Sequence, residues 1–285
     1  MSDLTITLHI VRERITTIVV PSYIVLGILG NAFCIFYFLQ KNQRSSSCAF
    51  HLLLVAIINI ITVIFGVTAA LLDLWDPISS KLLLYCRLRI YINHTLLLIR
   101  RIFTVLVSIN TYTMASERLT CRMFTQQSNA IKYAIGVVIS SPLITIHILI
   151  MLTTISSQRI MPDMYSLIFT IYQLLIAGII PSLTMIIFNY LARFNMRRST
   201  MRYNNIVKRE QEHQHLRIVT IQIIIYIISA ELAPLTKVCV QLTTNIAEKS
   251  QDRKAIEAFV TFIANTFLLY LNTWAPFFIY RFITF

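Results

Sequence analysis

Long apolar stretches separated by short polar segments dominate the chain. Seven of these stretches are long enough to cross the hydrocarbon core of a membrane, which takes about 20 residues of helix. They are Ile15–Leu39, Ala49–Leu72, Leu88–Ala115, Ala134–Ile155, Tyr165–Ala192, Ile218–Leu242 and Ala258–Phe285. The pattern predicts an all-α fold, in which residues 1–285 form one membrane domain built as a bundle of seven transmembrane helices.

The composition leads to the same membrane class. Hydrophobic residues make up 56% of the chain and charged residues 13%, which is more apolar surface than a soluble domain buries. Five of the seven prolines lie inside the apolar stretches, where spanning helices tolerate them. The N-terminal segment lacks the pattern of a cleavable signal peptide, so we expect the first span to act as an uncleaved signal.

The basic residues of the loops predict the orientation. With the N-terminus outside, the inner loops hold thirteen basic and three acidic residues, and the outer segments hold ten basic and eight acidic residues. Positive loops favour the cytoplasmic side, so we expect an extracellular N-terminus and a cytoplasmic C-terminus. Topology therefore accounts for the net charge of +13, and we expect no nucleic-acid partner.

Several residues in these spans match the motifs of one receptor family; they are Gly30-Asn31, Asn59, Cys86, Pro181, Pro234, and Pro276 with Tyr280. Together they resemble the rhodopsin-like (class A) G-protein-coupled receptors over essentially the whole chain, and the run from Cys86 to Tyr91 resembles the invertebrate neuropeptide branch. The resemblance implies an extracellular ligand, a heterotrimeric G protein as partner and a plasma-membrane location. It also implies switch roles for Pro234, Pro276 and Tyr280, together with the motif at residues 110–112.

Two sites compete for the position of the family's Asp-Arg-Tyr motif. Asn110 lies about 36 Å of helix from Cys86, which suits a single tilted crossing, whereas Glu117 would need about 46 Å. Ser108 to Tyr112 therefore matches the motif, and Glu117-Arg118 is expected in the loop. Asn110 and Thr111 cannot form the charge-assisted pair of the family. We expect a weaker resting-state latch, with altered or lost G-protein coupling.

Three ionisable residues lie near the middle of the predicted spans. Arg100 and Arg101 fall near the middle of the third span, at the depth of Glu231 in the sixth. A charge at that depth costs at least ~2.5–3.5 kcal/mol unless it is paired or hydrated. We expect Glu231 to bridge to one arginine, in a polar network with Asn31 and Asn59; the alternative is an arginine that only satisfies carbonyls or snorkels.

The resemblance also places a ligand site at the outer half of the third span. Its candidate contacts are Arg87, Tyr91, Asn93, His94 and Leu97. Asn93 occupies the family's main contact position, and the absence of an aspartate there argues against an amine ligand. A peptide-like ligand fits better than an amine. Asn59 likewise replaces the family's sodium-binding aspartate, so no sodium sensitivity is expected. Arg87 is either a contact for an acidic ligand or an interface anchor.

The cysteines leave the family's disulfide in doubt. Cys86 stands at the family's disulfide position, but the segment between the fourth and fifth spans has no cysteine to pair with it. A free Cys86 and a bridge to Cys239 both stay open, with the free thiol favoured. No spacing indicates a metal site, a cofactor or a catalytic motif, so we do not expect an enzyme.

Two other functions remain for a chain of this pattern. One is a non-signalling or decoy receptor copy, which the missing arginine at position 111 favours. The other is a seven-helix transporter or channel, which would be expected to show paired repeats with broken helices. No such repeat is visible in the sequence.

Overall fold

The computed structural model consists almost entirely of helices. It describes residues 3–41, 46–67, 83–116, 123–151, 153–155, 158–160, 163–199, 206–243, 250–268, 271, 273, 275 and 278. The π-helical segments, marked η, continue α-helices without a break in the helical backbone. The elements are α1 (Asp3–Arg14), η1 (Ile15–Val19), α2 (Val20–Leu39), α3 (Ser47–Thr62), η2 (Val63–Val67), α5 (Leu83–Met114), α7 (Gln127–Met151), β1 (Thr153–Ile155), β2 (Gln158–Ile160), α8 (Asp163–Leu174), η4 (Leu175–Ile179), α9 (Ile180–Ser199), α10 (Ile206–Thr243), α11 (Gln251–Phe262) and η5 (Ile263–Leu268).

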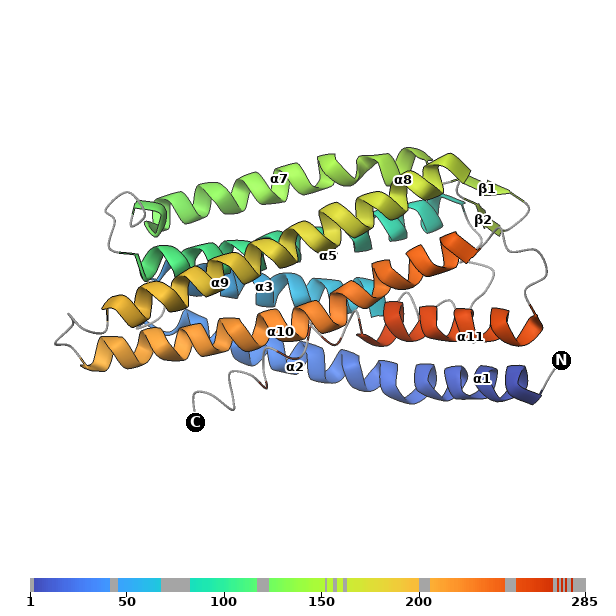
Figure 1. The fold of residues 1–285 in the computed structure, drawn as a ribbon, viewed down its shortest axis with the longest axis horizontal. Coiled ribbons are helices and arrows are strands. Elements are labelled where there is room, and N and C mark those ends of the chain that lie inside the picture. Colours follow the sequence, from blue (N-terminus) through green and yellow to red (C-terminus); the bar gives the residue numbers. More distant parts are fainter. Residues whose placement is uncertain are drawn as a thin grey trace.

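The helices run side by side along the long axis of the molecule (Figure 1). Within the described residues, six helical stretches are long and apolar enough to span a membrane. They are Asp3–Leu39, Ser47–Gly66, Arg87–Met114, Gln127–Met151, Tyr165–Arg197 and Leu216–Val240, and each overlaps one of the first six predicted spans. The predicted seventh begins within α11 and continues through η5, which pack against α1 and α10.

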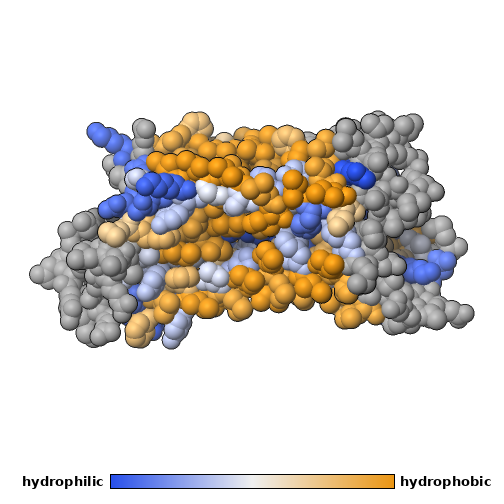
Figure 2. Space-filling view, turned by 90° about the horizontal axis from the view of Figure 1, so that it is seen from above, coloured by the Kyte–Doolittle hydropathy of each residue, from blue (hydrophilic) through white to orange (hydrophobic). Residues whose placement is uncertain are grey.

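The outer surface of the bundle is apolar. Figure 2 shows hydrophobic side chains covering most of the middle of the molecule. Large apolar side chains point outward along the spans, among them Phe36, which is 71% exposed, and Ile150, which is 65% exposed. In water such a surface would drive aggregation, whereas in lipid it is the normal exterior. The fold is therefore that of a membrane protein.

Two ends of the predicted spans differ from the structure. The first helix begins at Asp3 rather than near Ile15, and its added segment α1 lies beside α11, where the Arg12 guanidinium sits 5.1 Å from the Phe262 ring centre. Contact with another helix thus supports a segment too polar to be predicted as a span. The fourth helix ends at Met151, and Thr153–Ile155 form β1, which pairs antiparallel with β2.

A buried polar joint holds the first two spans together. The side-chain amide of Asn31 donates to the carbonyl oxygens of Gly27, at 2.7 Å, and of Thr273, at 2.6 Å. Its Oδ1 accepts from Asn59 Nδ2 at 3.0 Å. Helices in lipid gain little from the hydrophobic effect, so packing and hydrogen bonds of this kind hold them in register. Asn31 thereby joins α2 to α3 and to the segment that contains Thr273.

The joint predicts a thermodynamic coupling between its two asparagines. Asn31→Leu and Asn59→Leu should each lower the stability of the purified protein, by about 1–2 kcal/mol, because each leaves a buried partner unsatisfied. Thermal unfolding in lipid nanodiscs measures the effect. The double variant should lose clearly less than the sum of the single losses. Strictly additive losses would show that the two side chains act independently.

Candidate functional site

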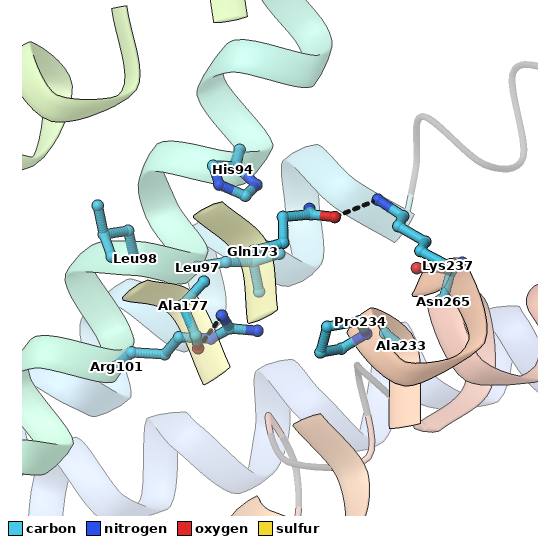
Figure 3. Close-up of a pocket in the computed structure, with 10 residues that line it drawn as sticks. All are labelled: His94, Leu97, Leu98, Arg101, Gln173, Ala177, Ala233, Pro234, Lys237 and Asn265. Carbon is cyan, nitrogen blue, oxygen red and sulfur yellow. Dashed lines mark hydrogen bonds between the residues drawn. The ribbon is translucent and has the colours of Figure 1, made fainter. Parts of the chain in front are cut away.

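A small cavity lies between the third, fifth and sixth spans and the start of the last helical segment (Figure 3). Its volume is about 40 Å³, which is room for about three water molecules. α5, α8, η4, α10 and η5 all contribute to its wall. The lining residues are His94, Leu97, Leu98, Arg101, Gln173, Ala177, Ala233, Pro234, Lys237 and Asn265.

Arg101 is anchored to the backbone of the fifth span. One Nη donates a hydrogen bond to the carbonyl oxygen of Ala177 in η4, as Figure 3 shows. Pro181 lies four residues after Ala177 and has no N–H with which to close the usual helical bond to that carbonyl. An unpaired carbonyl in the bilayer costs several kcal/mol, so the guanidinium replaces the bond that the proline removes. Arg101 is 6% exposed and its Nε has no partner among the described residues.

Lys237 is the second cation of the cavity. Its Nζ donates to Gln173 Oε1 at 2.7 Å and lies 5.2 Å from the centre of the Phe169 ring. The amide oxygen and the ring face both stabilise a positive charge, but neither neutralises it. The charges of Arg101 and Lys237 repel each other and both act on the His94 ring. None of the described residues that line the cavity is acidic.

Glu231 lies close to the cavity but does not line it. Its Oε1 accepts a hydrogen bond of 2.5 Å from Ser182 Oγ. Its Oε2 faces Gly178, where an added Cβ would lie 2.6 Å from the carboxylate. Among the described side chains, the partner of Glu231 is therefore a serine of α9 rather than an arginine of α5. The Ala177 carbonyl already holds Arg101, which is why the expected bridge is not formed.

Arg100 takes a different direction from its neighbour. It is 2% exposed and buried in the bundle, yet it does not line the cavity. Successive residues of a helix point about 100° apart, so two adjacent arginines cannot both face the same space. The predicted polar network therefore divides into two described parts, the joint of Asn31 with Asn59 and the cavity region with Arg101 and Glu231.

Only some of the five ligand-contact candidates lie at the cavity. His94 and Leu97 line the cavity, whereas Arg87, Tyr91 and Asn93 lie on other parts of α5. The Tyr91 hydroxyl donates to the Pro142 carbonyl at 3.2 Å, and this bond turns it toward α7. The His94 ring packs 5.6 Å from the rings of both Phe169 and Tyr172, and its Nε2 is buried with no hydrogen-bond partner among the described residues.

The C-terminal end of α5 contacts two helices through neutral side chains. Asn110 Nδ2 lies 2.7 Å from His51 Nδ1, which also lies 2.9 Å from Ser47 O. One ring proton satisfies both neighbours if the Asn110 amide presents its oxygen, and we assign that orientation. Thr111 Oγ1 lies 4.0 Å from Cys48 Sγ and donates to Val107 O.

Tyr112 completes the contacts of this motif. Its ring centre lies 5.4 Å from that of Phe188 on α9. α5 ends at Met114, so Asn110 falls in its last turns and Glu117-Arg118 follow the helix, outside the described residues. The motif residues thus contact α3 and α9 without a charge.

Three predicted residues cannot be placed at the site. Pro276 and Tyr280 lie outside the described residues, and so does the side chain of Cys86. Cys239, the alternative disulfide partner, is an exposed free thiol in this structure. Pro234 was predicted as a switch residue of the sixth span and is found in the cavity wall.

The sequence interpretation missed the second cation of the site. Lys237 had been counted among the basic residues outside the membrane, although it lies within the sixth predicted span, three residues after Pro234. Its position inside an apolar stretch was the available signal, because ionisable residues there usually serve a function. Gln173, Asn265 and His51 carried no comparable signal, since polar uncharged residues are common in spanning helices.

A scan of protein-family models and a search of curated proteins find no match to the chain. The cavity and the contacts at the C-terminal end of α5 are therefore the features that bear on function. Both involve α5, which packs against α3, α7 and α9 and so occupies the centre of the bundle.

The close approach at Gly178 predicts a specific destabilisation. In Gly178→Ala the new methyl group should push the Glu231 carboxylate away from Ser182, which costs a charge-assisted hydrogen bond of about 1.5–3 kcal/mol. The melting temperature should fall below that of the wild type. Gly136→Ala is the matched control, because a Cβ there meets nothing within 4 Å. It should keep or raise the melting temperature, since alanine favours a helix. Equal behaviour of the two variants would contradict the contact.

Proposed function

We propose that the chain is a seven-helix receptor of the rhodopsin-like, G-protein-coupled type, with its N-terminus outside the cell. It binds an extracellular ligand that is not a biogenic amine, and the cavity beside His94 and Leu97 receives one group of that ligand. The alternative of a receptor copy that binds without signalling shares this site and differs at the inner end of α5.

The observation that carries the proposal is the polar cavity between α5, η4, α10 and η5. It has positive and uncharged polar groups within an apolar bundle, the combination that fixes a ligand's orientation. The two cations disfavour an amine, because a second positive charge would enter an already positive space. The surrounding wall combines a proline, Pro234, with a π-helix, η4, and such irregular helices are frequent at functional sites.

The inner end of α5 supports the type of switch expected of an Asn-Thr-Tyr sequence. Asn110 and Thr111 hold α5 to α3 through neutral contacts with His51 and Cys48. Neutral hydrogen bonds contribute about half the energy of charge-assisted ones. The resting state is therefore held less tightly than an acid–arginine pair would hold it, and Thr111 offers no cation to a G protein.

The number of spans can be tested by the positions of the chain ends. Seven spans place the two termini on opposite sides of the membrane, whereas six place them on the same side. An epitope tag before Met1 should be stained on intact cells. A tag after Phe285 should be stained only once the cells are permeabilised. Staining of both tags on intact cells, or of neither, would exclude a seven-span arrangement.

Restoring the missing charge should strengthen coupling. Thr111→Arg places a guanidinium at the inner end of α5, and we expect basal recruitment of a heterotrimeric G protein to rise several-fold in cells with matched surface expression. Met114→Arg is the control, since it adds the same charge one turn away on an exposed position. A ligand screen on the unmodified receptor uses the same assay, with ion flux measured in parallel.

The outcomes separate the candidate functions. Ligand-dependent recruitment by the unmodified chain supports a signalling receptor. Recruitment by Thr111→Arg alone identifies a non-signalling copy that has lost its arginine. Equal responses of Thr111→Arg and Met114→Arg would contradict a motif at residues 110–112. Ion flux without recruitment would replace the receptor by a channel or transporter.

A further inference from the structure

We infer that the cavity binds a carboxylate, so that the ligand of this receptor is an organic acid or a peptide presented by a carboxylate end. The inference rests on the proposed receptor function and adds the chemical class of the ligand. It is carried by the presence of two cations, Arg101 and Lys237, in the wall of a cavity whose described lining contains no acid.

The cavity has more hydrogen-bond donors than acceptors. Arg101 brings five N–H groups and Lys237 three, and the described bonds use one of each, to Ala177 and Gln173. Arg101 Nε is buried without a partner among the described residues. A buried donor without an acceptor costs about 1–3 kcal/mol. A carboxylate offers about four acceptor positions and no donor, which is the chemistry that the cavity lacks.

The charge of the cavity also favours a carboxylate ligand. Two cations face this space, and Glu231, a described acid close to the cavity, is bonded to Ser182 outside the cavity wall. Glu231 therefore lowers the field of the arginine without filling its free donor positions. A monoanion between Arg101 and Lys237 would offset their repulsion, which is strong in a medium of low dielectric constant. An ammonium group would increase it.

The size of the cavity limits which part of a ligand enters. About 40 Å³ holds a group of a few heavy atoms and not a whole ligand, since drug-sized pockets measure about 300–1,000 Å³. Leu97, Leu98 and Ala233 line the remaining wall and suit a short apolar stem behind the charged group. A small monocarboxylate, or the C-terminus of a peptide, meets both conditions.

The test compares propionate with propionamide, which have the same shape and differ in charge. The full chain in lipid nanodiscs is melted with each compound at constant ionic strength, with potassium chloride as a plain anion. Propionate at ten times its dissociation constant should raise the melting temperature by about 3 °C, and propionamide and chloride should not. A short peptide with a free C-terminus, melted beside its amidated form, separates a peptide source from a small acid.

Substitutions test whether propionate binds at the cavity. Lys237→Gln should abolish the propionate shift and Lys237→Arg should retain it, because the second keeps the charge. Arg101→Gln should also abolish it, although this variant loses the bond to Ala177 and is informative only if it melts cooperatively. Lys132→Gln removes an exposed lysine of α7 and should leave the shift unchanged. Equal shifts with propionamide or chloride, or a shift that survives Lys237→Gln, would overturn the carboxylate site.

The result is independent of the signalling assay. A propionate shift without G-protein recruitment upholds the carboxylate site and refutes the signalling receptor. Recruitment by a neutral ligand, with no shift by propionate or by the free peptide, refutes the carboxylate site and leaves the receptor. No shift in any arm up to millimolar concentrations also refutes the site.

Discussion

Every backbone carbonyl in the hydrocarbon core needs a donor, and the carbonyl of Ala177 has lost its usual α-helical donor. Pro181 removes the N–H, η4 changes the local register, and Arg101 crosses from α5 to supply the bond. The charged side chain of Arg101 therefore makes a structural contact near the middle of its span. Its guanidinium also lines the cavity (Figure 3), and Glu231 bonds with Ser182 rather than with this arginine.

Side-chain hydrogen bonds also join helices at three other interfaces of the bundle. Asn31 bonds with Asn59 between α2 and α3, Thr95 bonds with Thr145 at 2.7 Å between α5 and α7, and Lys237 bonds with Gln173 between α10 and α8. Lipid tails are as apolar as the side chains that face them, so apolar burial alone does not select one arrangement of the helices. These pairs provide that selection, and the apolar residues fill the space around them.

Hydropathy predicts where the helices lie because the bilayer imposes one length on every span. Segments held by contacts elsewhere in the fold escape this rule, as the polar helix Asp3–Arg14 and the strand Thr153–Ile155 show. The positions of Arg101 and Glu231 within their predicted spans placed both residues at the same depth in the membrane. These positions did not indicate that a backbone carbonyl would bond the arginine. His94 and Leu97 were named through the resemblance, which places ligand contacts on the outer half of the third span. Lys237 was missed because a count of loop charges assigns each lysine near a boundary to water.

The helix that carries Ala177 also carries Phe188, about 16 Å further along its axis. Arg101 holds the first position and Tyr112 packs on the second, and both belong to α5. α5 and the α8–η4–α9 helix are therefore in contact at two positions along their length. The contact at Ala177 is made by the Arg101 guanidinium, which has further N–H donors that the described bonds do not use. Any group that draws this guanidinium toward the cavity would also weaken its bond to Ala177, which lies on the same helix as the Phe188 ring that packs against Tyr112.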